Sequence, residues 1–114
     1  MIYITTTFTV NMLKESCNVR FEKLNEVEFI RQFKEFFGNT TIVPAISHEN
    51  TARMLGRKLG IAVNLYNRVN ITLEPGDIAF VAVPKLRFSE SREFTDEEIQ
   101  QAEFAYWKVT IKFD

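Results

Sequence analysis

Two different hydrophobic periods follow one another directly in the first third of the chain. In NVRFEKL, residues 18–24, apolar and polar residues alternate, which predicts a half-buried strand. In NEVEFIRQFKEFFG, residues 25–38, the apolar side chains recur every three or four positions, which predicts a helix capped by Asn25 and Gly38. A chain that mixes strands and helices in this way folds as a sheet covered by helices.

Strand-like patterns recur elsewhere in the chain. IYITTTFTV, residues 2–10, is rich in β-branched and aromatic residues and predicts a first strand that ends near Asn11. Residues 68–86 contain two strand-like runs around the turn sequence EPGD, and Pro84 indicates that the second run borders an edge or a bulge. The alternating residues 104–113 predict a closing strand.

A second helix is predicted in the middle of the chain. After a loop that contains Pro44, the sequence HENTARMLGRKLG, residues 48–60, places apolar residues at spacings of three and four. Ser47 is the candidate N-cap and Gly60 the candidate terminator, so the pattern predicts that His48 lies in the first helical turn.

A third, short helix is predicted from a capping box. Thr95 and Glu98 have the required spacing, and acidic residues fill the first turn. The polar residues 87–94 before it lack an apolar period and are expected to form an exposed loop. Together the patterns predict one α/β (α+β) domain over residues 1–114, with a mixed β-sheet flanked by helices.

Composition limits the classes of protein to which the chain can belong. Of its 114 residues, 46% are hydrophobic and 25% are charged, which is typical of a globular domain. Cys17 is the single cysteine, and no signal peptide or membrane span is evident, so we expect a cytoplasmic protein without membrane contact. The net charge of −1 argues against binding of long DNA or RNA, although a few arginines could still bind a small anion.

The single histidine is the strongest candidate for chemistry. An imidazole titrates near neutral pH, and a helix N-terminus supplies free N–H groups that attract anions, so His48 could act as a general acid on a phosphate. The guanidinium groups of Arg68 and Arg87 could bind phosphate oxygens, and Glu90 lies three residues after Arg87. The alternative is that His48 is an ordinary surface or capping residue and that these charged residues are only solvated. The sequence contains no metal-ligand spacing, so no metal or cofactor is expected.

Four short segments, taken in order, resemble a known family. They are FTVNML near the N-terminus, ISHENTARMLG in the middle, NRVNI at the expected third strand and RFSE in the late loop. The ordered set resembles the type III anti-CRISPR ring nucleases of archaeal viruses and phages, and the resemblance covers nearly the whole chain. The segment Ile-Ser-His stands where that family usually has Ile-Gly-His.

The resemblance implies a homodimer that binds cyclic tetra-adenylate across its two-fold axis. It also implies cleavage into linear di-adenylates with 2′,3′-cyclic phosphates, without a metal or cofactor, and thus antagonism of type III CRISPR immunity. The family's functional positions fall on residues of this chain, with the catalytic roles on His48, Arg87 and Glu90 and the substrate-binding roles on Thr9, Asn11, Ser47 and Arg68.

Two other functions remain as alternatives. A binding protein could sequester the cyclic oligonucleotide without cutting it. A DNA-binding virion protein or transcription factor is disfavoured by the net charge of −1.

Overall fold

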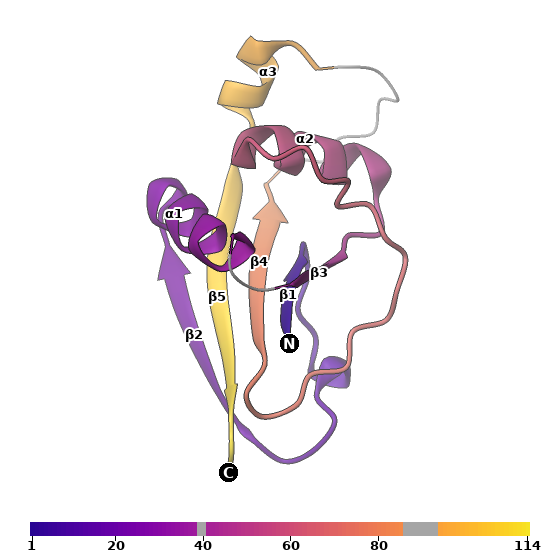
Figure 1. Ribbon diagram of the computed structural model, residues 1–114, viewed down its shortest axis with the longest axis vertical. Helices are drawn as coiled ribbons and strands as arrows, with labels where there is room; N and C mark the ends of the chain where they lie inside the picture. Colours follow the sequence, from indigo (N-terminus) through magenta and orange to yellow (C-terminus); the bar gives the residue numbers. More distant parts are fainter. Residues whose placement is uncertain (39–40, 86–93) are drawn as a thin grey trace.

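The computed structural model describes residues 1–38, 41–85 and 94–114 as one mixed sheet with three helices (Figure 1). The elements in chain order are β1 (Ile2–Thr5), a 3₁₀ turn (Val10–Met12), β2 (Asn18–Leu24), α1 (Glu26–Phe37), β3 (Ile42–Ala45), α2 (Glu49–Leu59), β4 (Ile78–Pro84), α3 (Asp96–Gln101) and β5 (Phe104–Lys112).

The five strands are arranged in the order β2-β5-β4-β1-β3. Strand β1 runs parallel to both β3 and β4, whereas β5 is antiparallel to β2 and β4. The predicted fold class, an α+β domain with a mixed sheet flanked by helices, is therefore confirmed. Because β1, β3 and β4 are parallel, their carboxyl ends meet at one edge of the sheet, where α/β sheets commonly bind ligands.

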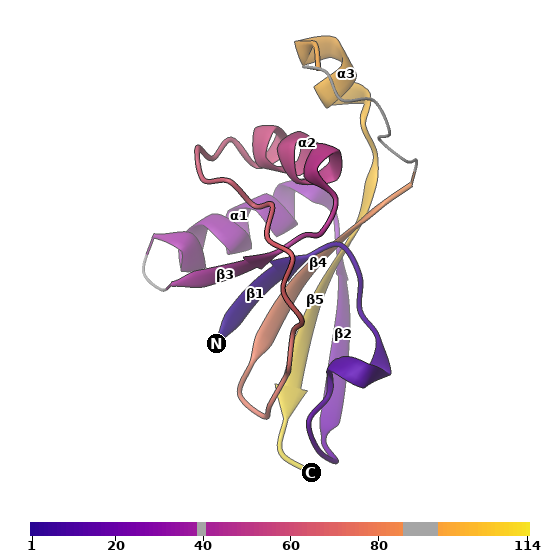
Figure 2. The same ribbon diagram turned by 90° about the vertical axis from the view of Figure 1, so that its right-hand side faces the viewer.

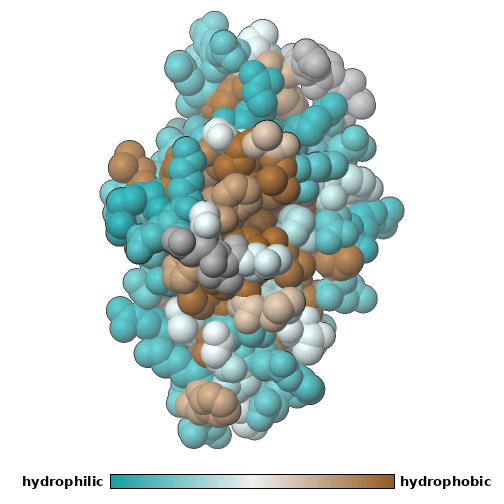
Figure 3. Space-filling model, in the orientation of Figure 1, coloured by the Kyte–Doolittle hydropathy of each residue, from teal (hydrophilic) through white to brown (hydrophobic). Residues whose placement is uncertain are grey.

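Helices α1 and α2 cover one side of the sheet, and the 3₁₀ turn lies on the other side (Figure 2). Under the helices, Phe29 and Phe33 of α1 contact the ring of Phe80 edge to face, with centroids 5.5 and 5.9 Å apart. Leu55 and Leu59 of α2 complete this core and are almost fully buried. In Figure 3, apolar side chains gather in the middle of the helix-covered side and hydrophilic ones surround them.

The opposite face of the sheet is covered by connections instead of helices. Ile71 and Leu73 come from the long connection before β4, and Phe8 and Met12 come from the connection after β1. They pack against residues of β4 and β5 such as Val109, which is 1% exposed. The domain thus has two cores, one on each face of the sheet.

Three expectations about strands were wrong. The first strand ends at Thr5 and not near Asn11. Residues 68–73 form no ladder within the described chain, and instead cross the face of the sheet, where Ile71 and Leu73 are buried. Conversely, Ile42–Ala45, expected to be a loop, forms the edge strand β3, where Pro44 is tolerated because one side of the strand is unpaired.

The expected helix ends are mostly confirmed. Asn25 accepts a hydrogen bond from the backbone N–H of Glu28 at 2.8 Å, and Gly60 ends α2 with a φ of 69°. The capping box between Thr95 and Glu98 is present in both directions, at 3.0 and 3.1 Å.

The start of α2 and the end of β4 add two details. The N-cap of α2 is His48 and not Ser47, so the histidine lies just before the first turn rather than within it. Pro84 is the last residue of β4 and pairs only with β5, since β1 pairs with β4 no further than Val81. This agrees with the expected edge position of Pro84. No helix in the described ranges is long and apolar enough to cross a membrane.

An ion pair between a buried lysine side chain and a partly exposed glutamate links α1 and α2. Glu26 accepts hydrogen bonds from Lys58 at 2.6 Å and from the Tyr106 hydroxyl at 2.9 Å, and the Lys58 side chain is only 7% exposed. Burial raises the pKa of the Glu26 carboxyl, but the hydrogen bonds from Lys58 and Tyr106 outweigh that effect and hold the pKa below its ordinary value.

We expect Glu26→Gln to lower the free energy of unfolding by about 1–3 kcal/mol at neutral pH, because the buried Lys58 ammonium loses its counter-charge. The native pKa of Glu26 is depressed, so its contribution is present above the unfolded carboxyl pKa and is lost as the pH falls through the native value. Urea unfolding of wild type and variant should therefore converge in acid. Glu22→Gln, which removes only a surface pair with Arg20, should change stability by less than about 1 kcal/mol at any pH. Equal losses in the two variants would contradict this account.

Candidate functional site

A pocket of about 590 Å³ lies beside the carboxyl ends of β1 and β3, and we call it the carboxyl-edge pocket. Its polar lining comes from the ends of those strands, the connection after β1 and the connection that follows Asn67. The polar residues that line it are Thr5, Thr7, Thr9, Asn11, Ser47, Arg68, Asn70 and Thr72. Residues that are far apart in the sequence are therefore brought together by the parallel strands.

Hydrogen bonds to β3 hold Arg68 at the pocket. The Asn67 side chain donates to the carbonyl of Pro44 at 2.8 Å, and its backbone N–H donates to the carbonyl of Ile46 at 2.9 Å. The Thr5 hydroxyl donates to the carbonyl of Ala45 at 2.9 Å and joins the ends of β1 and β3. These bonds fix the two strand ends and the residue before Arg68 as one unit.

A second set of backbone bonds holds the opposite wall. The N–H of Leu73 donates to the carbonyl of Met12 at 2.6 Å, and the N–H of Lys14 donates to the carbonyl of Leu73 at 3.1 Å. Asn11 directly precedes Met12, so this bridge fixes Asn11 opposite residues 69–72.

The charge of the pocket favours an anionic ligand. Arg68 is exposed and is the one charged residue among the described residues that line it. In the ranges that the structure describes, no carboxylate forms an ion pair with this guanidinium. Threonine and serine hydroxyls and asparagine amides surround it. This set of donors suits phosphate and ribose oxygens.

The structure places four of the seven expected site residues in this one pocket. These are all four expected substrate-binding residues, Thr9, Asn11, Ser47 and Arg68. The expectation that Arg68 begins a strand was wrong, since it lies in an irregular connection. The expected catalytic residues Arg87 and Glu90 lie outside the described residues.

His48 follows Ser47 at the N-terminus of α2. It is exposed, its carbonyl accepts the first helical bond from the N–H of Ala52 at 2.9 Å, and its imidazole makes no capping bond. His48 is not among the residues that line the carboxyl-edge pocket, although its neighbour Ser47 is. The imidazole therefore does not cap the helix. His48 is near the pocket because it follows the lining residue Ser47 in the chain.

Sequence reasoning missed several lining residues, including Thr7, Asn70 and Thr72. A signal for Thr7 existed in TTTFT, residues 5–9, because residues at alternate positions of an extended segment face the same side. Asn70 and Thr72 carried no comparable signal, since their segment was expected to be part of the sheet.

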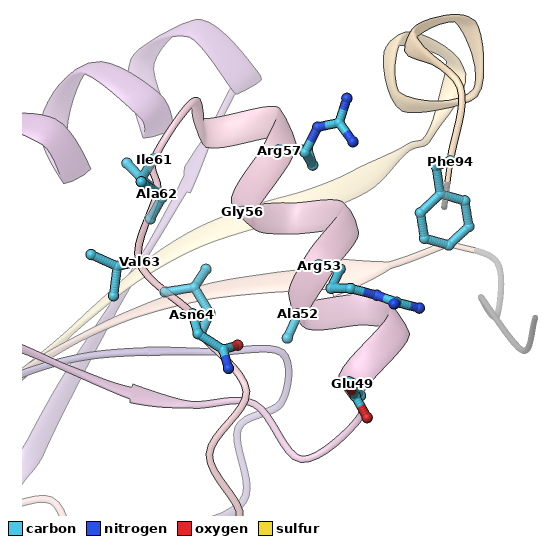
Figure 4. Close-up of a pocket in the computed structure, with 11 residues that line it drawn as sticks. Glu49, Ala52, Arg53, Gly56, Arg57, Ile61, Ala62, Val63, Asn64 and Phe94 are labelled. Atoms are coloured by element: carbon cyan, nitrogen blue, oxygen red, sulfur yellow. The ribbon is translucent and has the colours of Figure 1, made fainter. Parts of the chain in front are cut away.

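Another pocket, of about 340 Å³, lies against α2 and contains none of the expected site residues (Figure 4). In Figure 4, Arg53 and Arg57 extend from α2 toward the side of Phe94. Arg57 forms an ion pair with Asp96 at 3.2 Å, and Arg53 donates to the Asn50 side chain. Both guanidinium groups thus already have partners within the protein. Within the described ranges, no group of three or more His, Cys, Asp or Glu side chains could hold a metal ion.

The structure is therefore an α+β domain with a pocket at the carboxyl ends of two parallel strands, and one arginine stands among the described residues that line it. The chain belongs to the STIV B116-like family, whose sequence pattern matches residues 2–106.

Two relatives agree with this assignment. The chain is 32% identical over 83 residues to Uncharacterized protein 26 of Sulfolobus islandicus filamentous virus (isolate Iceland/Hveragerdi), a match that covers 72% of this chain and 70% of that protein. The structure of the present chain is similar to that of B116 of Sulfolobus turreted icosahedral virus, with a TM-score of 0.83 and 26% sequence identity. The match covers 96% of this chain and 97% of the other. Both relatives are proteins of archaeal viruses, and the family is therefore a viral one.

Proposed function

We propose that this viral protein is a metal-independent ring nuclease that cleaves cyclic tetra-adenylate. The observation that carries the proposal is the convergence of Thr9, Asn11, Ser47 and Arg68 on one pocket that has no carboxylate among its described lining residues, with the exposed His48 next to Ser47 in the chain. The resemblance assigns substrate binding to those four positions. Parallel strands bring them together from three separate segments of the chain.

The proposed reaction is an internal transesterification. A ribose 2′-hydroxyl attacks its own 3′-phosphate, so that the bond between O2′ and phosphorus forms and the bond from phosphorus to the 5′-oxygen breaks. The 2′-hydroxyl proton passes to solvent, and His48 as general acid gives a proton to the departing 5′-oxygen. Two such cuts convert the ring into two linear di-adenylates, each with a 2′,3′-cyclic phosphate and a 5′-hydroxyl.

The protein groups would lower the barrier by position and charge. Thr9, Asn11 and Ser47 would hold ribose and backbone oxygens, which keeps the attacking and leaving oxygens in line. Arg68, together with Arg87, would stabilise the negative charge that develops on phosphorus, and Glu90 would orient Arg87 or His48. No step of this route requires a metal or another cofactor.

Such an activity would remove the second messenger of type III CRISPR immunity in the cytoplasm of the infected host. The protein would then act as an antagonist of that immunity. The alternative is a protein that binds and sequesters the same ring without cutting it.

One experiment separates these functions. Purified protein is incubated with an excess of labelled cyclic tri-, tetra- or hexa-adenylate in the presence of a chelator, and the products are resolved. Turnover of the tetra-adenylate to products with 2′,3′-cyclic phosphates supports the proposal. Tight binding with an intact ring supports sequestration, and neither binding nor cleavage contradicts both.

We predict a symmetric homodimer in solution. A ligand with four phosphates needs more polar surface than one carboxyl-edge pocket supplies, and a two-fold axis would give two equivalent cuts. Sedimentation velocity at micromolar concentration should show twice the subunit mass of 13.3 kDa. A species of subunit mass alone, even with cyclic tetra-adenylate present, would refute this prediction.

A further inference from the structure

The face of the sheet opposite the helices contains a groove of about 490 Å³, which we call the aromatic groove. Three aromatic rings line it. Phe21 stands edge to face against Phe8 at 5.3 Å and against Trp107 at 6.4 Å between ring centroids. None of the described residues that line the groove is charged, and Phe21 is 52% exposed. Together the three rings form a contiguous apolar patch at the surface, and such patches commonly mark binding sites.

The volume of the groove favours a small ligand with a flat aromatic ring over a macromolecule. Ligand pockets typically have volumes of about 300–1,000 Å³ and are lined by aromatic and aliphatic groups with a few polar ones. The aromatic groove has this volume and this lining, with hydroxyls contributed by Thr6 and Thr7. Its walls come from the connection after β1 and from β2, β4 and β5, so most of them are rigid strands.

The groove adjoins the carboxyl-edge pocket across a single stretch of backbone. Thr5 and Thr9 line the carboxyl-edge pocket, whereas Thr6 and Phe8 line the aromatic groove, and Thr7 lines both. Side chains from successive residues therefore alternate between a hollow that suits phosphate and ribose and a hollow that suits a flat apolar ring. A nucleotide has both parts, because its base is bonded directly to its ribose.

We propose that the aromatic groove is the subsite for an adenine base whose phosphate and ribose lie in the carboxyl-edge pocket. The base would stack on the face of one aromatic ring, as bases commonly do on aromatic residues of β-sheets. It would meet a neighbouring ring edge-on. The Lys23 ammonium lies 5.8 Å from the centroid of the Trp107 ring. This inference rests on the proposed nucleotide ligand and specifies where its bases lie.

The test follows the indole N–H resonance of Trp107, the one tryptophan of the chain, by nuclear magnetic resonance. Two probes are titrated to millimolar concentration, adenosine 5′-monophosphate and ribose 5-phosphate, which differ only in the base. The adenosine nucleotide should shift the Trp107 signal saturably, and ribose 5-phosphate should leave it in place. Equal shifts with both probes, or no shift with the nucleotide, would overturn the proposal.

Matched variants sharpen the result. Phe21→Leu keeps an apolar side chain but removes the ring, and it should weaken nucleotide binding by about fivefold to a hundredfold, the range for loss of one base–aromatic stack. Val27→Ala changes another exposed apolar residue, which lies on α1 and is 77% exposed, and should have no effect. If Phe21→Leu binds like wild type, the groove is not the base subsite.

The same measurements distinguish the base subsite from self-association, and failure of the subsite from failure of the proposed function. A Trp107 signal that moves on protein dilution alone would show that a second copy of the chain covers this face, and the base subsite would then be wrong. The titration involves no cleavage, so failure of the ring nuclease assay leaves its result unchanged. Conversely, cleavage without any base-dependent shift would support the proposed function and refute the subsite.

Discussion

Replacing His48 by alanine is expected to slow cleavage of cyclic tetra-adenylate by about 100-fold to 10,000-fold, the usual effect of losing a general acid. Binding should survive, because Arg68 and the hydroxyl and amide groups of the carboxyl-edge pocket remain in place. The fold should survive as well, since the imidazole is exposed and makes no capping bond. Single-turnover cleavage and equilibrium binding, measured on the same preparations, give the two quantities separately.

A second variant separates proton transfer from helix capping. His48→Asn supplies one of the best N-cap side chains but has no group that can give up a proton near neutral pH. It should be at least as stable as wild type and as slow as His48→Ala. If either variant cleaves at the wild-type rate, or if His48→Ala unfolds the protein, His48 is a structural residue and not the general acid.

Arg68→Ala is the contrasting variant at the same site. Its guanidinium would interact with the phosphate both before and during the reaction, so its loss should weaken binding and slow cleavage together. An Arg68→Ala variant that binds normally would indicate that the phosphate lies elsewhere.

The largest loss of stability is expected from Phe80→Ala. Phe80 lies on β4 near the centre of the sheet, has no exposed surface and contacts the rings of Phe29, Phe33 and Phe36 at centroid distances of 5.5 to 5.9 Å. Removing this ring leaves a cavity that three aromatic side chains cannot close. We therefore expect the free energy of unfolding to fall by about 3–5 kcal/mol.

Thermal and urea unfolding of Phe80→Ala measure this loss. The matched control is Phe113→Ala, which removes the same ring from a position that is 78% exposed. It should change the free energy of unfolding by no more than about 0.5 kcal/mol. A loss below about 1 kcal/mol in Phe80→Ala would mean that the core repacks far more freely than its edge-to-face geometry indicates.

The amino-acid sequence by itself determined the elements whose signals are local. The apolar stripe and the Asn25 cap of α1, the capping box of α3 and the alternation of β5 each depend on residues a few positions apart. They were predicted correctly because helix periods and caps act over single turns. The mixture of these elements was sufficient to predict the α+β class.

Tertiary structure alone decided which extended segments became strands. Residues 68–73 have a pattern as favourable for a strand as Ile42–Ala45, which contains a proline, yet only the latter joined the sheet. Ile42–Ala45 takes the edge position beside β1, whereas Ile71 and Leu73 of the other segment bury their side chains against the face of the sheet. The hydrogen bonds that decide this connect residues about 40 to 76 positions apart, such as Thr5 with Ala45 and Ile2 with Ile78.

The candidate site divides in the same way. Residue types indicated His48 and Arg68, and the family resemblance assigned substrate binding to Thr9, Asn11 and Ser47 as well, but no local pattern in the sequence brings these residues to one pocket. That proximity arises because the parallel strands β1 and β3 end at the same edge and because Asn67 binds the backbone of β3. No local pattern predicted the aromatic groove either, because Phe8, Phe21 and Trp107 come from three separate segments. The antiparallel pairing of β2 with β5 places Phe21 opposite Val109 and thus near Trp107. Residue types determine which chemical groups are available. The distances between those groups depend on long-range strand pairing, which no short stretch of sequence specifies.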